Sequence, residues 1–357
     1  MPEKPWIIYG AYGYTGKRIA RKAVERGLRP IIAGRNCKKV RTLAEQLNLD
    51  YRCFDLQDFE QICMHMDKVG ILLNCAGPFI ATSVPLVKAC MEAKADYLDI
   101  TGEIEVFEYI HALDEKALKT GTILCPGAGF DVIATDCMAA TLKLCMPDAG
   151  YLALAFHSRG PLSPGTAKTI MEGFKYKGMI RKNGVIKSVP FACKVREIDY
   201  GSGPMTSVTI PWGDVSTAFY STEIPNIEVY VSVPERWINI LKIMGFFRPF
   251  ITRKLVHKFL KKIIEFQFKG PTSQERKATS VSLWAEIRNN SGRCLQATLT
   301  TANGYEVTIT GALGIVEKLL AQRPPPGVYT PSQLMGADYI SRLPGCGPIN
   351  IFTIHNH

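Results

Sequence analysis

The feature that most constrains the fold is a glycine-rich turn near the amino terminus, between a strand pattern and a helix pattern. Residues 6–9 are a short apolar run, and Gly10, Gly13 and Gly16 follow it at intervals of three, before an amphipathic pattern that continues to Gly27. In such a turn the backbone can approach a pyrophosphate closely, while the helix N-terminus directs free N–H groups at the anion. The spacing departs from the commoner Gly-x-Gly-x-x-Gly form, so a tight turn without a ligand is the alternative.

The alternation of strand and helix patterns continues to residue 147. Further strand patterns lie at residues 30–33, 51–54, 69–74, 97–100 and 122–125. The run 69–74 is apolar throughout, as in strands that are buried on both faces of a parallel sheet. We therefore expect an α/β fold: a Rossmann-type doubly wound parallel sheet, with the strand-to-helix junctions at one edge, plus a second α+β domain with an antiparallel sheet.

The residue after the second strand predicts which nicotinamide dinucleotide is bound. An acidic residue at this position favours NAD, but this chain has Arg35 there, with Lys38 and Lys39 close behind. A guanidinium at this point matches the 2′-phosphate of NADP. A solvated helix face is the alternative for these basic residues. We expect NADP as the cofactor.

Five short segments at the ends of the expected strands form a set. They are Gly-Ala-Tyr-Gly-Tyr-Thr-Gly at 10–16, Ala-Gly-Arg at 33–35, Asn-Cys-Ala-Gly-Pro-Phe at 74–79, Asp-Ile-Thr-Gly-Glu at 99–103 and Gly-Phe-Asp at 129–131. In this order they resemble the saccharopine dehydrogenase-like oxidoreductase family, which also includes trans-acting enoyl reductases. Further matches extend over nearly the whole chain, but the resemblance does not identify a substrate.

The resemblance also implies which residues contact the cofactor. The glycine turn and Arg35 would hold its phosphates, Asp55 would approach the adenine, and the later loops would lie along the nicotinamide half and at the cleft. The complete expected set is Gly10, Tyr12, Gly13, Tyr14, Thr15, Gly16, Arg35, Asp55, Ala76, Gly77, Pro78, Thr101 and Gly102.

Hydride transfer requires a group that stabilises or protonates the atom that gains charge. The candidates near the expected cleft are Glu103, Asp131, Arg159 and Thr166. Capping of the helices that follow is the alternative for Glu103 and Asp131, and a surface ion pair is the alternative for Arg159. His157 lies in a strand pattern, which favours a structural role.

The pattern changes after residue 147, which we take as the end of the NADP-binding domain. Residues 281–287, 295–299 and 305–309 alternate apolar and polar side chains between polar turns and predict a three-stranded antiparallel meander. We expect residues 148–323 to form a substrate and dimerisation domain of a homodimer. Residues 324–357 would pack back on the first domain, with a helix at 331–343 and a strand at 349–354.

Residues 235–269 combine aromatic and apolar side chains with nine Lys or Arg and two Glu. This composition is typical of a helix that lies on an anionic membrane or covers an apolar substrate. An ordinary amphipathic helix pair on the sheet is the alternative. The segment contributes most of the net charge of +11, so we do not expect a nucleic-acid partner.

Other chemistries lack their sequence signatures. The chain has no His-Glu-x-x-His, no Cys-x-x-Cys and no Gly-x-Ser-x-Gly, so we expect no metal site and no serine nucleophile. Eleven cysteines without paired spacing, and no signal-peptide pattern, indicate buried thiols in a cytoplasmic protein.

The sequence thus favours an NADP(H)-dependent oxidoreductase. It would transfer hydride to a C=O, C=N or C=C bond of an unidentified, rather apolar small molecule. The alternative is a membrane- or lipid-associated NADP-binding protein without turnover, with peripheral membrane contact through 235–269.

Overall fold

The computed structural model describes residues 5–158, 178–234 and 279–354, which fall into two compact units. The first unit comprises Met1–Cys137 and Gly304–Pro344, and the second comprises Met138–Asn303 and Gly345–His357. The chain therefore enters the second unit after Cys137, within a helix. It returns to the first unit at Gly304 and enters the second unit again after Pro344. These divisions differ from the expected boundaries at 147 and 324 because the long helix that starts at Gly304 packs with the first unit.

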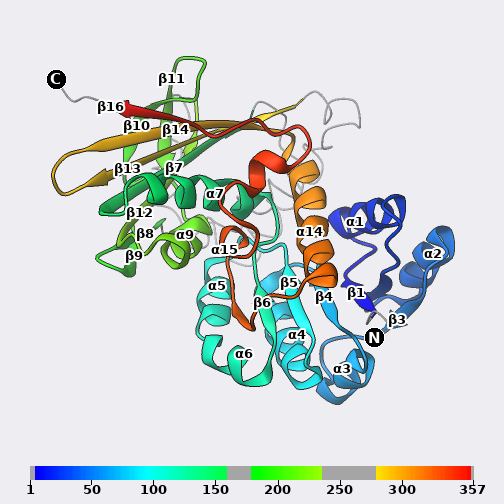
Figure 1. The fold of residues 1–357 in the computed structure, drawn as a ribbon. Helices are drawn as coiled ribbons and strands as arrows, with labels where there is room; N and C mark the ends of the chain where they lie inside the picture. The colour runs from blue at the N-terminus through cyan, green and yellow to red at the C-terminus, as the bar shows by residue number, and fades with distance from the viewer. Residues whose placement is uncertain (1–4, 159–177, 235–278, 355–357) are drawn as a thin grey trace, which may run out of the picture. The chain divides into compact units, whose positions relative to one another are not determined.

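The first unit is built on a parallel sheet of seven strands in the order β15-β6-β5-β4-β1-β2-β3 (Figure 1). The strands are β1 (Trp6–Tyr9), β2 (Ile31–Gly34), β3 (Tyr51–Cys53), β4 (Ile71–Asn74), β5 (Asp96–Asp99), β6 (Ile123–Cys125) and β15 (Gly327–Val328). β1, β2, β4, β5 and β6 consist of buried residues, as expected for strands covered on both faces. The Rossmann-type sheet predicted from the sequence is confirmed.

Two sets of helices pack in this unit. α1 (Tyr14–Glu25) packs against α2 (Cys37–Leu47) and α14 (Gly304–Ala321), while α4 (Phe79–Ala93) packs against α3 (Phe59–Met66), α5 (Ile104–His111) and α6 (Asp114–Thr120). α7 (Phe130–Cys145), α15 (Pro331–Met335) and the 3₁₀ helix η1 (Tyr339–Arg342) complete the helices described here. Asn36 and Asp58 cap α2 and α3 through their side chains, as is typical of Asn and Asp at helix starts.

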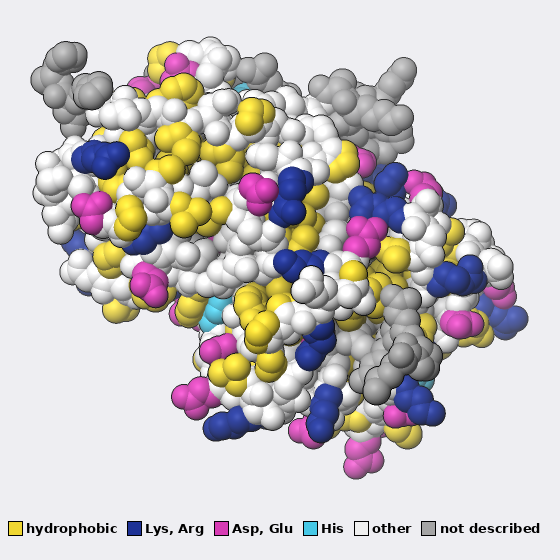
Figure 2. Space-filling view, viewed as in Figure 1, with side chains coloured by type: hydrophobic (Ala, Val, Ile, Leu, Met, Phe, Trp, Pro, Cys, Tyr) yellow, Lys and Arg dark blue, Asp and Glu magenta, His cyan; other side chains and the backbone are white. Residues whose placement is uncertain are grey.

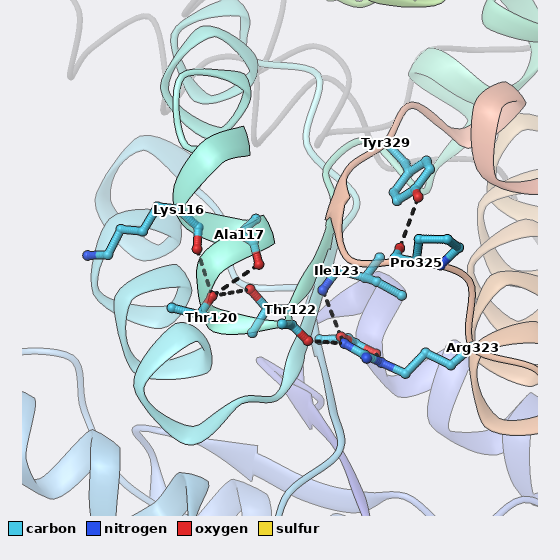
Figure 3. A network of polar contacts seen from close by, with 10 residues as sticks. Lys116, Ala117, Thr120, Thr122, Ile123, Arg323, Pro325 and Tyr329 are labelled. Carbon is cyan, nitrogen blue, oxygen red and sulfur yellow. Dashed lines mark hydrogen bonds and ion pairs between the residues drawn. The ribbon is translucent and has the colours of Figure 1, made fainter.

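An ion pair between the partly exposed Arg323 and the buried Asp96 attaches the returning segment to the sheet (Figure 3). Arg323 donates from Nε to Asp96 Oδ2 at 2.8 Å and from Nη2 to Asp96 Oδ1 at 2.6 Å. The same nitrogen Nη2 donates to the Gly121 carbonyl, and the Ile123 N–H donates to Asp96 Oδ1. Asp96 begins β5, so this pair joins the segment after α14 to β5 and to the start of β6, the strand that β15 pairs with.

The expected third strand at 305–309 is wrong, because these residues form the first turns of α14. The apolar side chains Val307 and Ile309 belong to a longer pattern that also buries Leu313, Val316 and Leu319. From Ile309 onward these side chains recur every three or four residues, which is helical periodicity, whereas the five-residue window 305–309 on its own has the spacing of an alternating strand. The two strands before it form the predicted hairpin.

The second unit contains a mixed sheet in the order β10-β11-β12-β7-β13-β14-β16, with β8 between β12 and β9 at one side. Only β12 and β7 are parallel neighbours among the pairs described. The strands are β7 (Ala149–Ser158), β8 (Gly178–Lys182), β9 (Val185–Val189), β10 (Val195–Asp199), β11 (Pro204–Thr209), β12 (Asn226–Ser232), β13 (Val281–Asn289), β14 (Cys294–Thr301) and β16 (Asn350–Ile354), and α9 (Asp214–Thr222) packs on β8 and β12.

The carboxyl-terminal segment does not pack as one piece on the first unit. β15 joins the first sheet beside β6, but β16 pairs antiparallel with β14 in the second sheet, from Cys294 opposite Ile354 to Thr298 opposite Asn350. The expectation that all of 324–357 packs on the first unit is therefore wrong for the last strand, because β16 forms its backbone pairing with β14. The helix expected at 331–343 is interrupted by Gly336, which has a φ of +96°, and is divided into α15 and η1.

Some expectations fall on residues outside the described ranges: Arg159, Thr166 and the basic aromatic segment 235–269. On the face shown in Figure 2, Lys and Arg side chains are interspersed with Asp and Glu. Among the described helices, none combines the length and the apolar composition needed to cross a membrane.

Candidate functional site

The loop after β1 follows a path that only glycine permits. Gly10 has a φ of +76°, and a β-carbon added to it would lie 2.8 Å from the Ala76 nitrogen. A β-carbon on Gly16 would lie 2.6 Å from the Gly10 carbonyl oxygen, which already accepts the Gly13 N–H at 3.0 Å. The glycines therefore let α1 start immediately beside the strand end and let the loops after β1 and β4 touch.

The contact between Gly10 and Ala76 lies where the strand order of the sheet reverses. The chain runs outward from β1 through β2 to β3, then crosses to β4 on the other side of β1. The strand order thus reverses between β1 and β4, and ligands of open α/β sheets bind outside the carboxyl ends of the strands at such a reversal. The predicted phosphate and nicotinamide loops meet at this place.

The N-terminus of α1 is open to an anion. Gly13 is the N-cap residue, no side chain of the described residues caps this helix, and its first turn contains no acidic residue. The free N–H groups of a helix N-terminus carry partial positive charge. Because Gly13 and Gly16 have no side chains, this end of α1 fits a pyrophosphate.

Arg18 adds a positive charge one turn into α1, a feature that the sequence analysis missed. Its guanidinium carbon lies 3.9 Å from the ring centroid of Tyr14, and the Tyr14 and Tyr305 rings meet edge to face at 5.0 Å. Arg18 Nη1 is buried and has no hydrogen-bond partner among the described residues. A buried guanidinium nitrogen that lacks an acceptor is compatible with an anion at this turn. The Tyr14 side chain is half exposed and packs against Arg18 and Tyr305.

The corner after β2 holds the basic residues that were expected to select the cofactor. Arg35, Lys38 and Lys39 are all exposed, and within the described ranges no ion pair or hydrogen bond engages the Arg35 guanidinium. Lys39 Nζ lies 5.8 Å from the centroid of the Tyr12 ring, which covers Gly34. The positive side chains are thus gathered where an added phosphate would meet them.

Asp55 lies at the end of the neighbouring strand β3. Its Oδ1 accepts the N–H of Gln57 at 2.9 Å, which closes a local turn. The exposed carboxylate is therefore partly engaged by its own loop and does not form an ion pair with Arg35. It remains at the edge where the resemblance predicts the adenine.

The loop after β4 is held in place by a buried amide. Asn74 Oδ1 accepts the Ala76 N–H, and Asn74 Nδ2 donates to Thr82 and to the Tyr97 hydroxyl at 3.0 and 3.1 Å. Thr82 in turn donates to the Ala76 carbonyl at 2.7 Å. The Gly77–Pro78 peptide bond is cis. The N–H and the carbonyl of Ala76 are thus held by Asn74 and Thr82.

Asp99, at the end of β5, organises the two loops beyond it. Its Oδ1 accepts the N–H groups of Thr101 and Gly127 at 3.0 and 2.9 Å, and its Oδ2 accepts the Tyr97 hydroxyl. Burial raises the pKa of Asp99 to about 6 although these hydrogen bonds lower it. The sequence signal was an acidic residue ending an apolar strand, which we did not single out for a role of its own.

Glu103 contacts a helix other than the one it precedes. Its two carboxylate oxygens accept the N–H groups of Phe79 and Ile80, each at 2.8 Å. Because Phe79 begins α4, Glu103 caps α4 and fixes the loop 76–78 in front of it. The alternative weighed from the sequence, capping of α5, is not what the side chain does, because no side-chain cap bond is formed there.

Asp131, in the first turn of α7, contacts the loop 101–103 that contains Glu103. A β-carbon added to Gly102 would lie 3.0 Å from Asp131 Oδ2, so the carboxyl group covers the Thr101–Gly102 backbone. Burial raises the pKa of Asp131 to about 6. The structure therefore brings Asp131, Gly102 and Glu103 together at the carboxyl end of the sheet.

His157 belongs to the second unit and is held within its sheet. Its Nδ1 lies 2.6 Å from Ser232 Oγ, and its ring packs near Tyr200. The structural role favoured by its strand pattern is consistent with these contacts. The same unit contains a groove of about 760 Å³. Three of its charged side chains form ion pairs: Arg196 with Glu286 at 2.5 Å and Arg288 with Glu286 at 3.5 Å.

Comparison with known proteins identifies the first unit. Residues 6–125 match the family described as the saccharopine dehydrogenase NADP binding domain. The chain is 30% identical over 152 residues to a probable mitochondrial saccharopine dehydrogenase-like oxidoreductase of Arabidopsis thaliana, covering 38% of this chain and 34% of that protein. It is 27% identical over 208 residues to the saccharopine dehydrogenase-like oxidoreductase of Rattus norvegicus, covering 49% and 47%.

A second group of relatives is named for a different reaction. The chain is 28% identical over 138 residues to a trans-acting enoyl reductase of Mycobacterium bovis, covering 36% of this chain and 33% of that protein. The matched regions thus span between a third and a half of the length of these relatives.

Among solved structures, apo histidine-tagged saccharopine dehydrogenase (L-Glu forming) from Saccharomyces cerevisiae shares the fold. The TM-score is 0.65 over 99% of this chain and 100% of that chain, at 10% sequence identity. Residues 6–125 are therefore similar to the family described as the saccharopine dehydrogenase NADP binding domain, and the resemblance inferred from the motifs is confirmed.

Proposed function

We propose that this protein is an NADP(H)-dependent oxidoreductase that transfers hydride to a C=O, C=N or C=C bond of an apolar small molecule. The observation that carries this proposal is the contact between Gly10 and Ala76 at the reversal of strand order, next to the uncapped N-terminus of α1. The relatives' names, all of oxidoreductases or reductases, support the reaction class.

NADP is favoured over NAD by the basic corner after β2. Arg35 presents an unengaged guanidinium, and Lys38 and Lys39 lie on the first turn of α2. A planar guanidinium binds phosphate with paired hydrogen bonds. We assign to the other cofactor residues, from the glycine turn to Gly102, the roles that the resemblance implies, because their loops follow the carboxyl ends of the strands.

When bound, the nicotinamide supplies the hydride. The side chains of this protein must then orient the hydride acceptor and supply a proton. We assign proton donation to Asp131, because its carboxyl group lies against the Gly102 backbone at the strand ends and partial burial raises its pKa to about 6. Glu103 is a positioning residue, since both its oxygens are engaged by α4. Arg159 and Thr166 stay in the proposal as substrate-side candidates.

The second unit would provide the substrate surface and a homodimer contact. Its edge strand β16 exposes Ile351 and Phe352, which are 38% and 49% accessible. An edge strand with apolar side chains is a surface that a second copy can cover. A cytoplasmic location is supported by the free state of the cysteines.

A membrane- or lipid-associated NADP-binding protein without turnover is the second candidate, and the composition of residues 235–269 favours it. Both candidates predict binding of NADPH by the purified chain, so turnover separates them. NADPH absorbance at 340 nm would be followed with a panel of apolar aldehydes, imines and enoyl thioesters and with cell lipid extract. Oxidation that depends on substrate supports the oxidoreductase; tight binding with no oxidation throughout supports the second candidate.

A further inference from the structure

The buried carboxylate of Asp99 accepts hydrogen bonds from two loops and from its own strand. Its Oδ1 accepts the Thr101 N–H at 3.0 Å and the Gly127 N–H at 2.9 Å. Its Oδ2 accepts the Tyr97 hydroxyl at 2.9 Å. Because all three bonds end on its oxygens, Asp99 acts here as an ionised carboxylate, which only accepts hydrogen bonds.

A first chain of hydrogen bonds leads from Asp99 to the start of the loop 76–78. The Tyr97 hydroxyl donates its one proton to Asp99, so its oxygen accepts from Asn74, whose Nδ2 lies 3.1 Å away. This leaves Asn74 Oδ1 to accept the Ala76 N–H, at 2.9 Å. The carboxylate therefore determines which way the Asn74 amide faces, and the amide holds Ala76.

A second chain leads from Asp99 to the end of the same loop. The Thr101 N–H donates to Asp99, and the Thr101 hydroxyl accepts the Glu103 N–H at 3.0 Å. The Glu103 carboxylate accepts the Phe79 N–H, directly after the loop, at 2.8 Å. The loop 76–78 is thus held at both ends, by two chains that begin at one carboxylate.

We propose that Asp99 is a positioning residue for the cofactor, which fixes the loop 76–78 where the nicotinamide half binds. This inference rests on the proposed function, because the resemblance implies that these three residues lie along the nicotinamide. The loop has little freedom on its other side, since a β-carbon on Gly10 would lie 2.8 Å from the Ala76 nitrogen. Hydride transfer requires a closely defined position of the nicotinamide ring. Asp99 acts on that position through the two chains.

Asp99→Asn changes the hydrogen bonding with almost no change of shape. If Oδ1 of the amide keeps the N–H groups of Thr101 and Gly127, its Nδ2 faces the Tyr97 oxygen as a donor. The Tyr97 hydroxyl proton then has no acceptor on this side chain, and the direction of the first chain is lost. The volume at the end of β5 stays the same.

The same strand offers a matched control. Asp96 lies at the other end of β5, is buried like Asp99, and pairs with Arg323. Asp96→Asn therefore also disturbs a buried carboxylate of β5, but both chains to the loop 76–78 stay intact. General destabilisation acts in both variants, whereas a positioning role acts in Asp99→Asn alone. Tyr97→Phe removes only the first chain.

The position of the loop is tested on the full chain without the cofactor. Hydrogen exchange of peptides that cover residues 74–80 is followed by mass spectrometry and compared with the exchange of β1 in the same protein. We expect exchange at least about fivefold faster in Asp99→Asn and in Tyr97→Phe, and a change of less than about twofold in Asp96→Asn. Unchanged exchange in Asp99→Asn or in Tyr97→Phe would overturn the proposal, and so would equal acceleration in Asp96→Asn. If Asp99→Asn does not fold, Tyr97→Phe decides.

The link to the cofactor is measured by calorimetric titration with two ligands. They are NADPH and adenosine 2′,5′-bisphosphate, which has the adenine and the 2′-phosphate but no nicotinamide. Asp99→Asn should lower NADPH affinity about tenfold and change the affinity for the bisphosphate less than about twofold, while Asp96→Asn should change neither. Equal losses for the two ligands would overturn the nicotinamide role. If the unsubstituted protein binds neither ligand, the proposed function fails, and hydrogen exchange still decides whether Asp99 positions the loop.

Discussion

A β-carbon placed on Gly10 would lie 2.8 Å from the β-carbon of Ala76, which no pair of non-bonded carbon atoms tolerates. This contact joins the loop that we expect to hold the pyrophosphate to the loop beside the nicotinamide. Its effect on binding can be separated from the effect of backbone strain, because the chain offers a glycine with nearly the same φ in open space.

We expect Gly10→Ala to destabilise the protein by about 2–4 kcal/mol and to weaken NADPH binding at least tenfold, because the left-handed φ and the contact both oppose a side chain. Gly27→Ala is the control: Gly27 has a φ of +79° and nothing within 4 Å of the added carbon. It should cost about 1 kcal/mol and leave NADPH binding intact. Urea unfolding and calorimetric titration measure both effects. Similar binding losses in both variants would contradict the assigned role of Gly10.

Arg35→Ala should reduce NADPH affinity by about 10–100-fold, the worth of a charge-assisted pair with phosphate, and change NADH affinity by less than about twofold. Arg41→Ala is the matched control, since Arg41 lies on α2, the helix that follows Arg35, and pairs with Glu45. Equal losses for the two cofactors would show that Arg35 does not read the 2′-phosphate.

Glu103→Gln should lower stability by about 1–2 kcal/mol, because the amide retains only one acceptor for the two N–H groups at the start of α4. Glu105→Gln, an exposed change in the first turn of α5, should stay within about 0.5 kcal/mol. If Glu103 were instead the proton donor, kcat would collapse and the unfolding free energy would not change, which thermal unfolding and initial rates would reveal together.

Asp131 predicts a pH dependence of stability. Its folded pKa of about 6 lies above the ordinary value of 3.8, so the folded state holds the proton more tightly than the unfolded state. This contribution is complete below about pH 4 and is lost as pH rises through about 6. Asp131→Asn should therefore stabilise the protein at pH 8, by at most about 3 kcal/mol, relative to its effect at pH 4. Exposed Asp50→Asn is the control. A pH-independent difference would refute the raised pKa.

Arg323→Ala should destabilise the protein by about 2–3 kcal/mol, since it leaves the buried Asp96 carboxylate with only a backbone donor; the partial exposure of Arg323 keeps the loss at the low end for buried pairs. Arg342→Ala removes an exposed pair with Asp338 at 3.4 Å and should cost less than about 1 kcal/mol. Denaturant unfolding compares them. Equal costs would mean that the Arg323–Asp96 pair does not anchor the returning segment.

Much of the first unit could be predicted from local patterns. The six strands from β1 to β6, the caps Asn36 and Asp58 and the glycine turn each depend on residues close in sequence, where periodicity and capping chemistry act directly. The segment 305–309 was misread because its periodicity shows only when the following two turns are included.

Long-range partners were beyond the same reasoning. Glu103 precedes α5 but caps α4, twenty-four residues earlier in the chain, and Arg323 finds Asp96 across the fold. In the sequence Arg18 is one of many basic residues. It is distinguished by the neighbouring Tyr305 ring and by a buried Nη1 that has no acceptor among the described residues.

The sequence by itself determined the type of nucleotide site, because glycine positions, strand ends and the basic residue after β2 are local properties of the chain. The tertiary structure decided which side chains of that site are bound by neighbouring residues and which are available to contact a ligand. Whether a carboxylate caps a helix, covers a backbone or holds a proton depends on neighbours that the fold brings from distant positions. That information lies in packing and burial, which periodicity and spacing do not encode.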